Sequence, residues 1–219
     1  MKIHILRNGR IYTGVFGHPW AETLALSAGK VIALDQAALA WRGAPDATVE
    51  DLKGAFVMPS ITDAHVHLMW YARSLRELNL RDCTRAELLE NVRQQAEALP
   101  PGQWITGRGW DQNIWDDPSF PTASELDRVA PRHPVALRAK NGHALVANSA
   151  AIKAAGVDER TPDPVHGKIV RDERGEPNGI FLESAIGLIG QAKPEPSVET
   201  LVDLLDEAQD HLLALGITG

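Results

Sequence analysis

The stretch Met58–Leu68, MPSITDAHVHL, decides how the chain is expected to fold. It places Asp63, His65 and His67 at alternate positions inside an otherwise apolar run. Because successive side chains of a strand point to opposite faces of a sheet, residues two apart share a face. The alternation therefore predicts a strand that presents three polar, metal-capable side chains on one side.

Two histidines on one strand face have two interpretations. Each imidazole can be a core or interfacial group whose ring nitrogens bond to the backbone, and for a single histidine this is the more common case. A His-x-His pair with an in-phase aspartate favours the other interpretation, in which His65 and His67 bind one divalent metal from a rigid strand. We therefore expect a metal site.

The composition predicts a folded chain with neither nucleic acid nor a membrane as its partner. Of the 219 residues, 44% are hydrophobic and 23% are charged, and the net charge is −7 without a long basic run. Such a chain lacks the basic surface that binds nucleic acid or an anionic membrane. The single cysteine, Cys83, excludes an internal disulfide framework and fits a reducing compartment, so we expect a cytoplasmic protein.

Residues 1–58 are expected to form a small β-rich segment. Short apolar runs flank Asn8-Gly9, Ala28-Gly29 and Lys53-Gly54, and Asn-Gly in particular accepts the positive φ of a tight hairpin turn. Several short strands joined by glycine turns are typical of part of a β-sandwich.

After Pro59 the pattern changes to strands that alternate with helices. The expected elements are a strand over ITDAHVHL, helices capped by Thr84, Thr122 and Ser197, strands over WITGRGWD and PVALRAK, a short helix over NSAAIKAAG and a hairpin that turns at Glu173–Gly175. Strands alternating with helices favour right-handed βαβ units and a parallel sheet.

The predicted fold class is α/β, with residues 59–219 as the first part of a (β/α)8 TIM barrel and residues 1–58 as a preceding β-sandwich segment. An open three-stranded parallel sheet is the alternative. A parallel sheet is normally covered on both faces, whereas part of a barrel leaves one face and an edge exposed. We therefore expect a truncated barrel that belongs to a longer polypeptide and that can form a homo-oligomer.

Four blocks of the sequence, taken together, resemble a known family. Pro59-x-x-x-Asp-x-His-x-His after a β-rich segment, followed by LPPGQWITGRGWDQNIW, FPTASELDRVAPRHPVALRAKNGHALVANSAAI and GKIVRDERGEPNGIFLESA, is similar to the amidohydrolase superfamily of metal-dependent hydrolases. The four blocks in this order look most like its YtcJ-like branch, the amidohydrolase-3 group that includes N-substituted formamide deformylase. One departure is Ser60, where the family motif usually has glycine.

The resemblance implies the metal ligands. His65 and His67 match the metal-binding pair at the end of the first barrel strand, and Asp63 matches an aspartate of the catalytic site with a positioning role. Glu183 matches a glutamate that supplies a carboxylate ligand. Its equal alternative is a glutamate at a helix N-terminus, where the helix dipole favours it.

The resemblance also implies residues that face the substrate. His143 matches a histidine of the catalytic site that lines the substrate pocket, with a loop histidine that caps the NSAAI helix as the alternative. Trp110 and Asp111 follow the second strand and are expected to bind substrate, although Trp110 can instead pack in the core. Asn148 is expected to be an N-cap and not a ligand.

The implied activity is hydrolysis of a carbon–nitrogen bond other than a peptide bond, in a small amide-like substrate. The expected cofactor is a divalent metal, zinc, as one or two ions that activate water. The family's general base and remaining ligands are expected beyond residue 219, so the 219-residue chain alone is predicted to be inactive. The alternative is a truncated, non-catalytic fragment or pseudoenzyme that needs a partner.

Overall fold

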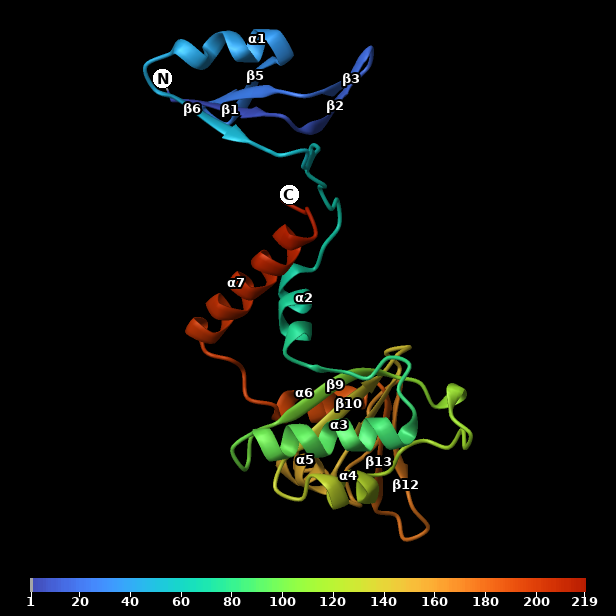
Figure 1. Cartoon of the computed structure of the whole chain (residues 1–219). Coiled ribbons are helices and arrows are strands. Elements are labelled where there is room, and N and C mark those ends of the chain that lie inside the picture. The colour runs from blue at the N-terminus through green and yellow to red at the C-terminus, as the bar shows by residue number, and fades with distance from the viewer. Residues whose placement is uncertain (1) are drawn as a thin grey trace. The chain divides into compact units, whose positions relative to one another are not determined.

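The computed structural model describes residues 2–219, which form two compact units (Figure 1). One unit comprises the residues up to His65 together with Asp210–Gly219, and the other comprises Val66–Gln209. The chain therefore leaves the first unit, builds the second and returns to the first. These units do not coincide with the ranges 1–58 and 59–219 that the sequence analysis separates.

The first unit contains two small sheets and two short helices. Its elements are β1 (Ile3–Arg7), β2 (Arg10–Val15), β3 (His18–Ala21), β4 (Leu24–Ser27), β5 (Lys30–Leu34), α1 (Asp35–Leu39), the 3-10 helix η1 (Ala40–Gly43), β6 (Ala47–Asp51) and β7 (Phe56–Val57). The strand orders are β5-β4-β1-β6 and β3-β2-β7. One small apolar cluster forms around Ile5 and Ala25 of the four-stranded sheet, and a second, around Ile11 and Leu24, contains residues of both sheets.

The glycine turns of this unit serve two different purposes. Ala28-Gly29 has positive φ at both residues, 49° and 74°, and joins β4 to β5 as the predicted antiparallel hairpin. At Asn8-Gly9 and Lys53-Gly54 the chain instead crosses from one sheet to the other, because β1 pairs in parallel with β6 and β2 pairs in parallel with β7. The two hairpins predicted there are wrong, and the bends form a corner between the sheets.

The segment before the histidine motif pairs with the last residues of the described chain. Ile61 and Ile217 form an isolated parallel bridge. The backbone N–H of Ile61 donates to the carbonyl of Gly216 at 2.9 Å, and that of Thr218 donates to the carbonyl of Ile61 at 3.0 Å. The strand that is predicted to begin in the final GITG is represented by this short ladder.

The strand predicted over ITDAHVHL is wrong beyond Ile61. Helix α2 (Leu68–Leu75) begins directly after the motif, and His67 is its N-cap residue. The chain between them forms a turn, because the carboxylate of Asp63 accepts the backbone N–H of His65 at 2.9 Å. His65 and His67 therefore do not alternate along one strand.

The second unit is built around a six-stranded mixed sheet. Its elements are α2, β8 (Leu78–Asn79), α3 (Arg85–Ala98), β9 (Ile105–Trp110), the 3-10 helix η2 (Gln112–Ile114), α4 (Ala123–Val129), β10 (Val135–Ala139), β11 (Ala144–Ala147), α5 (Ser149–Ala154), β12 (Gly167–Arg171), β13 (Pro177–Glu183), α6 (Ile186–Ala192) and α7 (Val198–Ala214), which continues into the first unit. The strand order is β12-β13-β11-β10-β9-β8. None of the helices within residues 2–219 is long and apolar enough to cross a lipid bilayer.

Helices pack against both faces of this sheet. Leu88 and Val92 of α3 and Leu126 of α4 join one buried cluster, and Ile152 of α5 and Ile186 of α6 join the cluster on the other face. The capping boxes predicted at Thr84 and Thr122 are both confirmed, as is the cap of α7 by Ser197. The hairpin predicted to turn at Glu173–Gly175 is also confirmed, as the antiparallel pair β12 and β13.

The sheet differs from the predicted series of barrel strands. β8, β9 and β10 are parallel, and α4 connects β9 to β10 as expected of a βαβ unit. At Asn141-Gly142, however, the chain turns back, and β11 pairs antiparallel with β10. The sheet is open, with β12 and β8 at its edges. The alternative prediction, an open parallel sheet of three strands, describes one half of it.

Asn148 is a buried N-cap that connects three segments. Its side chain is 0% exposed. The amide oxygen accepts the backbone N–H groups of Ala151 and Val135, and the amide nitrogen donates to the carbonyl oxygens of His133 and Ala130. The N-cap prediction for Asn148 is confirmed, and the residue additionally joins β10 to the start of α5.

We predict that Asn148→Ala lowers the free energy of unfolding by about 2–4 kcal/mol, because it removes a cap and leaves buried backbone groups without partners. The matched control is Asn91→Ala on α3, where the amide makes one long contact of 3.7 Å to the Cys83 sulfur and alanine is the better helix former. Urea unfolding of both variants measures the difference. Equal stability of the two variants would contradict the role given to Asn148.

Candidate active site

The three polar residues of the motif are all exposed, and the division between the two units falls within the motif along the sequence. His65 belongs to the first unit and His67 to the second. The ring of His67 stacks on Trp70 of α2, with ring centroids 4.5 Å apart. The carboxylate of Asp63 accepts the backbone N–H of His65 at 2.9 Å and so stabilises the turn that leads to it.

The donor chemistry of the motif suits a metal, but the described residues do not complete a ligand set. Imidazole and carboxylate are the donors that zinc takes in enzymes, and a catalytic zinc has three protein ligands. Within residues 2–219, no group of three or more His, Cys, Asp or Glu side chains is arranged to hold an ion.

A second group of polar residues lies along the side of the six-stranded sheet at which its parallel strands terminate, the carboxyl edge. Parallel β8, β9 and β10 end there, and so does β13, which runs in the same direction. β11 and β12 run in the opposite direction and begin there. The residues placed there by the strand directions are Asp82, Asp111, Lys140, Asn141, His143, His166 and Glu183. We call this set the carboxyl-edge cluster.

His143 and Glu183 are in direct contact within the carboxyl-edge cluster. His143 Nδ1 lies 3.0 Å from Glu183 Oε2, and the backbone N–H of Glu183 donates to the carbonyl of His143 at 3.0 Å. Both side chains are more than half exposed. A carboxylate paired with an imidazole can accept a proton, orient a ligand or hold a cation, so the pair has the composition of a functional site.

Glu183 adopts a backbone conformation that is uncommon for a glutamate. Its φ is +52°, in the left-handed region that costs a residue with a Cβ about 1 kcal/mol or more. Such strain is concentrated at functional positions. The residue ends β13 and precedes the N-cap of α6, Ala185, so the alternative of a glutamate in the first turn of that helix does not describe it.

The alternative for His143 also differs from the structure. The cap of the NSAAI helix is Asn148, whereas His143 lies before β11 in the turn that follows β10. Asn141 Oδ1 accepts the backbone N–H of His143 at 2.9 Å and so stabilises that turn. The dipeptide Asn141-Gly142 is a hairpin signal that would have predicted β11, and with it the position of His143.

Trp110 and Asp111 have different environments. The Trp110 ring is 0% exposed, donates from Nε1 to the carbonyl of Leu137 at 2.9 Å and stacks on Trp115 with centroids 6.1 Å apart. The structure thus shows the packing alternative for Trp110. Asp111 is half-buried at the sheet edge, and its carboxylate accepts the backbone and amide N–H groups of Asn113.

The loop between Asp111 and α4 is held by Arg85, a residue that the sequence analysis does not single out. Its guanidinium donates to both carboxylate oxygens of Glu125 at 2.8 Å and to Ser119 Oγ at 2.9 Å. It also lies over the ring of Trp115, 5.7 Å from the centroid. This planar, two-pronged contact joins α3, the loop and α4 into one support for the sheet edge.

The sequence profile of the amidohydrolase family matches residues 48–219. The chain belongs to the amidohydrolase family. This confirms the resemblance deduced from the four sequence blocks.

The relatives include three curated proteins that match long parts of this amidohydrolase chain. The chain is 33% identical to N-substituted formamide deformylase of Arthrobacter pascens over 100% of its own length and 42% of that protein's. It is 35% identical to YtcJ of Bacillus subtilis (strain 168), over 81% of the chain and 34% of YtcJ. Protein LONG AFTER FAR-RED 3 of Arabidopsis thaliana is 33% identical, over 98% of the chain and 37% of that protein.

Solved structures of two archaeal proteins are also similar. An uncharacterized metal-dependent hydrolase from Pyrococcus horikoshii OT3 is 29% identical with a TM-score of 0.71, and the match covers 100% of this chain and 42% of that one. An uncharacterized metal-dependent hydrolase from Pyrococcus furiosus is 30% identical with a TM-score of 0.69, over 98% of this chain and 43% of that one. The chain thus spans less than half the length of each of these relatives.

The Arg85–Glu125 contact predicts a specific pH dependence of stability. Burial raises the pKa of Glu125, but hydrogen bonds from Arg85 and Thr122 lower it more, so the net pKa lies below its ordinary value of 4.5. A carboxyl group whose pKa is lowered by folding stabilises the fold above its unfolded pKa, and this contribution is lost as the pH falls through the folded pKa. We therefore predict that Glu125→Gln costs about 1–2 kcal/mol near neutral pH and progressively less below 4.5.

Urea unfolding over a series of pH values measures this dependence. The control is Glu173→Gln in the exposed turn of the β12–β13 hairpin, which is expected to follow the wild-type curve. A constant difference between wild type and Glu125→Gln across the acid range would contradict the assignment.

Proposed function

We propose that this chain is the N-terminal part of a metal-dependent hydrolase that cleaves a carbon–nitrogen bond other than a peptide bond, in a small amide-like molecule. The observation that carries the proposal is the amidohydrolase match over residues 48–219, which includes the Asp63-x-His65-x-His67 motif. The likeness to N-substituted formamide deformylase supports the bond class, and the archaeal metal-dependent hydrolases support the need for a metal.

In this proposal His65, His67 and Glu183 hold the metal, for which zinc is the expected ion, as one or two ions. A bound ion of this kind supplies an activated water and polarises the scissile carbonyl. His143 contacts Glu183 at 3.0 Å, orients that carboxylate and faces the substrate. Asp111 binds substrate from the same sheet edge, and Asp63 sets the direction of His65 through its turn. Trp110 supports this edge from within the core.

The proposed architecture of the whole protein is a (β/α)8 barrel with a β-sandwich. In this proposal, residues 1–58 form part of the β-sandwich, and residues 59–219 form the first part of the barrel domain. The parallel ladder between Ile61 and Ile217 supports this assignment, because barrel strands pair in parallel. A cytoplasmic location, a small-molecule substrate and homo-oligomers remain predictions of the sequence analysis.

The proposal is tested with the complete gene product that contains these residues. We predict metal-dependent hydrolysis of a panel of N-substituted formamides and related amides. His65→Ala and His67→Ala are predicted to lower kcat/KM at least about 100-fold and to reduce the bound metal, because even the partners of metal ligands cost 10- to 100-fold. Metal content is measured by elemental mass spectrometry.

His4→Ala is the matched control, since His4 is a solvent-accessible histidine that bonds to Thr48 and Glu50 in the first unit. The 219-residue chain alone, assayed in parallel, is predicted to show no useful turnover. Turnover by this chain that is lost in His65→Ala would overturn that last prediction. A complete protein that binds no metal would favour the alternative, a pseudoenzyme that depends on a partner.

A further inference from the structure

The face of the six-stranded sheet that points away from α3 is apolar over β11, β13 and β12 and cationic over β9 and β10. Ile105 of β9 and Leu137 of β10 point into the cluster on the α3 face. By the alternation of a strand, Thr106 and Arg108 of β9, and Arg138 of β10, point to the opposite face. That opposite face is covered by α5 and α6 over β11, β13 and β12, but polar side chains lie on it over β9 and β10.

Arg108 and Arg138 are direct neighbours on adjacent strands, paired in parallel register. Neighbouring strands lie about 4.8 Å apart, so two guanidinium groups with the same charge begin close together and repel. A sheet pays this repulsion in stability unless an anion lies between or above the two side chains. The register therefore creates a place where an anion is favoured.

The surrounding residues compensate this charge only in part. The nearest carboxylate is Glu77, whose Oε2 lies 3.9 Å from Arg108 Nε, beyond hydrogen-bond distance. Arg108 Nε is buried and has no hydrogen-bond partner within residues 2–219. In the same described part of the chain, neither Arg138 nor Lys193 forms an ion pair. Three cationic side chains thus face one loosely placed carboxylate.

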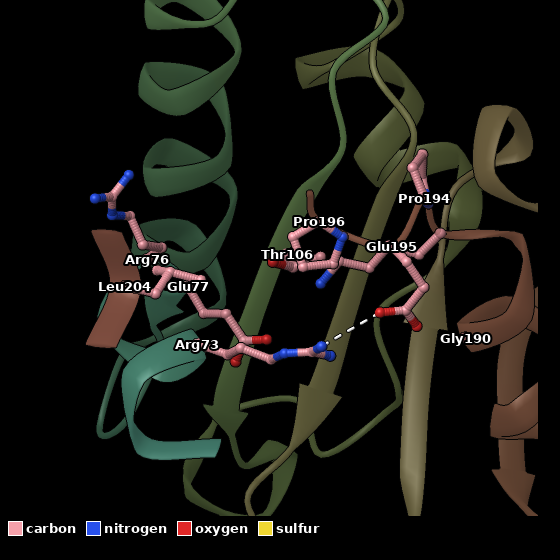
Figure 2. A pocket seen from close by; sticks show the side chains of 10 residues that line it. Arg73, Arg76, Glu77, Thr106, Gly190, Pro194, Glu195, Pro196 and Leu204 are labelled. Atoms are coloured by element: carbon pink, nitrogen blue, oxygen red, sulfur yellow. Dashed lines mark hydrogen bonds and ion pairs between the residues drawn. The ribbon is translucent and has the colours of Figure 1, made fainter. Parts of the chain in front are cut away.

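These side chains line a pocket of about 220 Å³, which we call the arginine pocket, formed by Glu77, Trp104, Arg108, Arg138 and Lys193 among others. It adjoins a second hollow of about 280 Å³, shown in Figure 2, and Glu77, Thr106, Gly190 and Lys193 line both.

The arginines of the second hollow already have partners. Arg73 pairs with Glu195 at 3.2 Å, the contact marked in Figure 2, and Arg76 pairs with Glu207 at 2.7 Å. The cationic side chains that form no ion pair, Arg138 and Lys193, therefore line the arginine pocket, and Lys193 also borders the second hollow.

We propose that the arginine pocket binds the oxyanion group of a small molecule, a carboxylate or a phosphate. Guanidinium groups recognise such oxygens through paired, charge-assisted hydrogen bonds, and Arg108 and Arg138 present two of them side by side. Trp104 supplies an apolar wall for the rest of the ligand. The site uses no residue of the carboxyl-edge cluster and no histidine of the motif, so it does not depend on the proposed hydrolase function.

The test uses the complete gene product that contains these residues, with inorganic phosphate and with benzoate as probes, at ionic strength held constant with sodium chloride. The melting temperature is expected to rise with probe concentration and to saturate, as for a ligand that binds the folded state. A rise with phosphate alone assigns a phosphate group, a rise with benzoate alone assigns a carboxylate, and a rise with both supports the shared oxyanion chemistry.

Two variants separate this site from general salt effects. Arg138→Glu places a carboxylate opposite Arg108, so it is expected to melt higher than wild type without a probe and to lose the probe-dependent rise. Arg138→Gln is expected to bind the effective probe at least about tenfold more weakly in isothermal titration calorimetry, because it removes a charged hydrogen-bond donor. Arg138 is exposed, so neither change disturbs the core.

The matched control is Arg174→Gln in the exposed β12–β13 turn, which is expected to keep the wild-type response. The proposal is overturned if neither probe raises the melting temperature of the wild-type chain. It is equally overturned if Arg138→Gln responds as strongly as the wild type and Arg174→Gln do.

Discussion

The main-chain pairing of β10 on both sides is the constraint on which the second unit depends. Its parallel register with β9 puts Arg138 beside Arg108, and its antiparallel register with β11 places His143 at the end of the turn between them. At its other end, the backbone N–H of Val135 bonds to the Asn148 side chain. A shift of one residue in this strand would turn each of its side chains to the opposite face of the sheet. The positions of the carboxyl-edge cluster and of the arginine pocket thus follow from the same set of hydrogen bonds.

The local features of the fold are predictable from sequence because their causes lie within a few residues. The capping boxes at Thr84 and Thr122 and the N-cap at Asn148 satisfy the free N–H groups of helices that begin beside them. The choice of strand partners is different. Asn8-Gly9 has the composition of a hairpin turn, yet β1 pairs with β4 and β6, because the burial of Ile3 and Ile5 is decided by residues far away in the sequence.

The candidate site shows the same division between local and long-range information. The alternation of Asp63, His65 and His67 fits a strand, but a short acidic side chain can instead bond to the backbone two residues later, and here it does. The residue types at Glu183 and His143 are available from the family resemblance. Their contact at 3.0 Å is not, since it requires β11 and β13 to be neighbours in a sheet that sequence periodicity alone does not order.

The return of the chain to the first unit has a consequence for the order in which the protein folds. The ladder between Ile61 and Ile217 closes a loop that contains the whole of the second unit. Contacts between distant residues are slow to form, because the entropy of closing a long loop must be overcome before the contact is made. On the ribosome, the segment around Ile61 emerges long before its partner is synthesised. The second unit can therefore acquire its structure first and shorten the loop, after which the earliest part of the chain to be made is among the last to be completed.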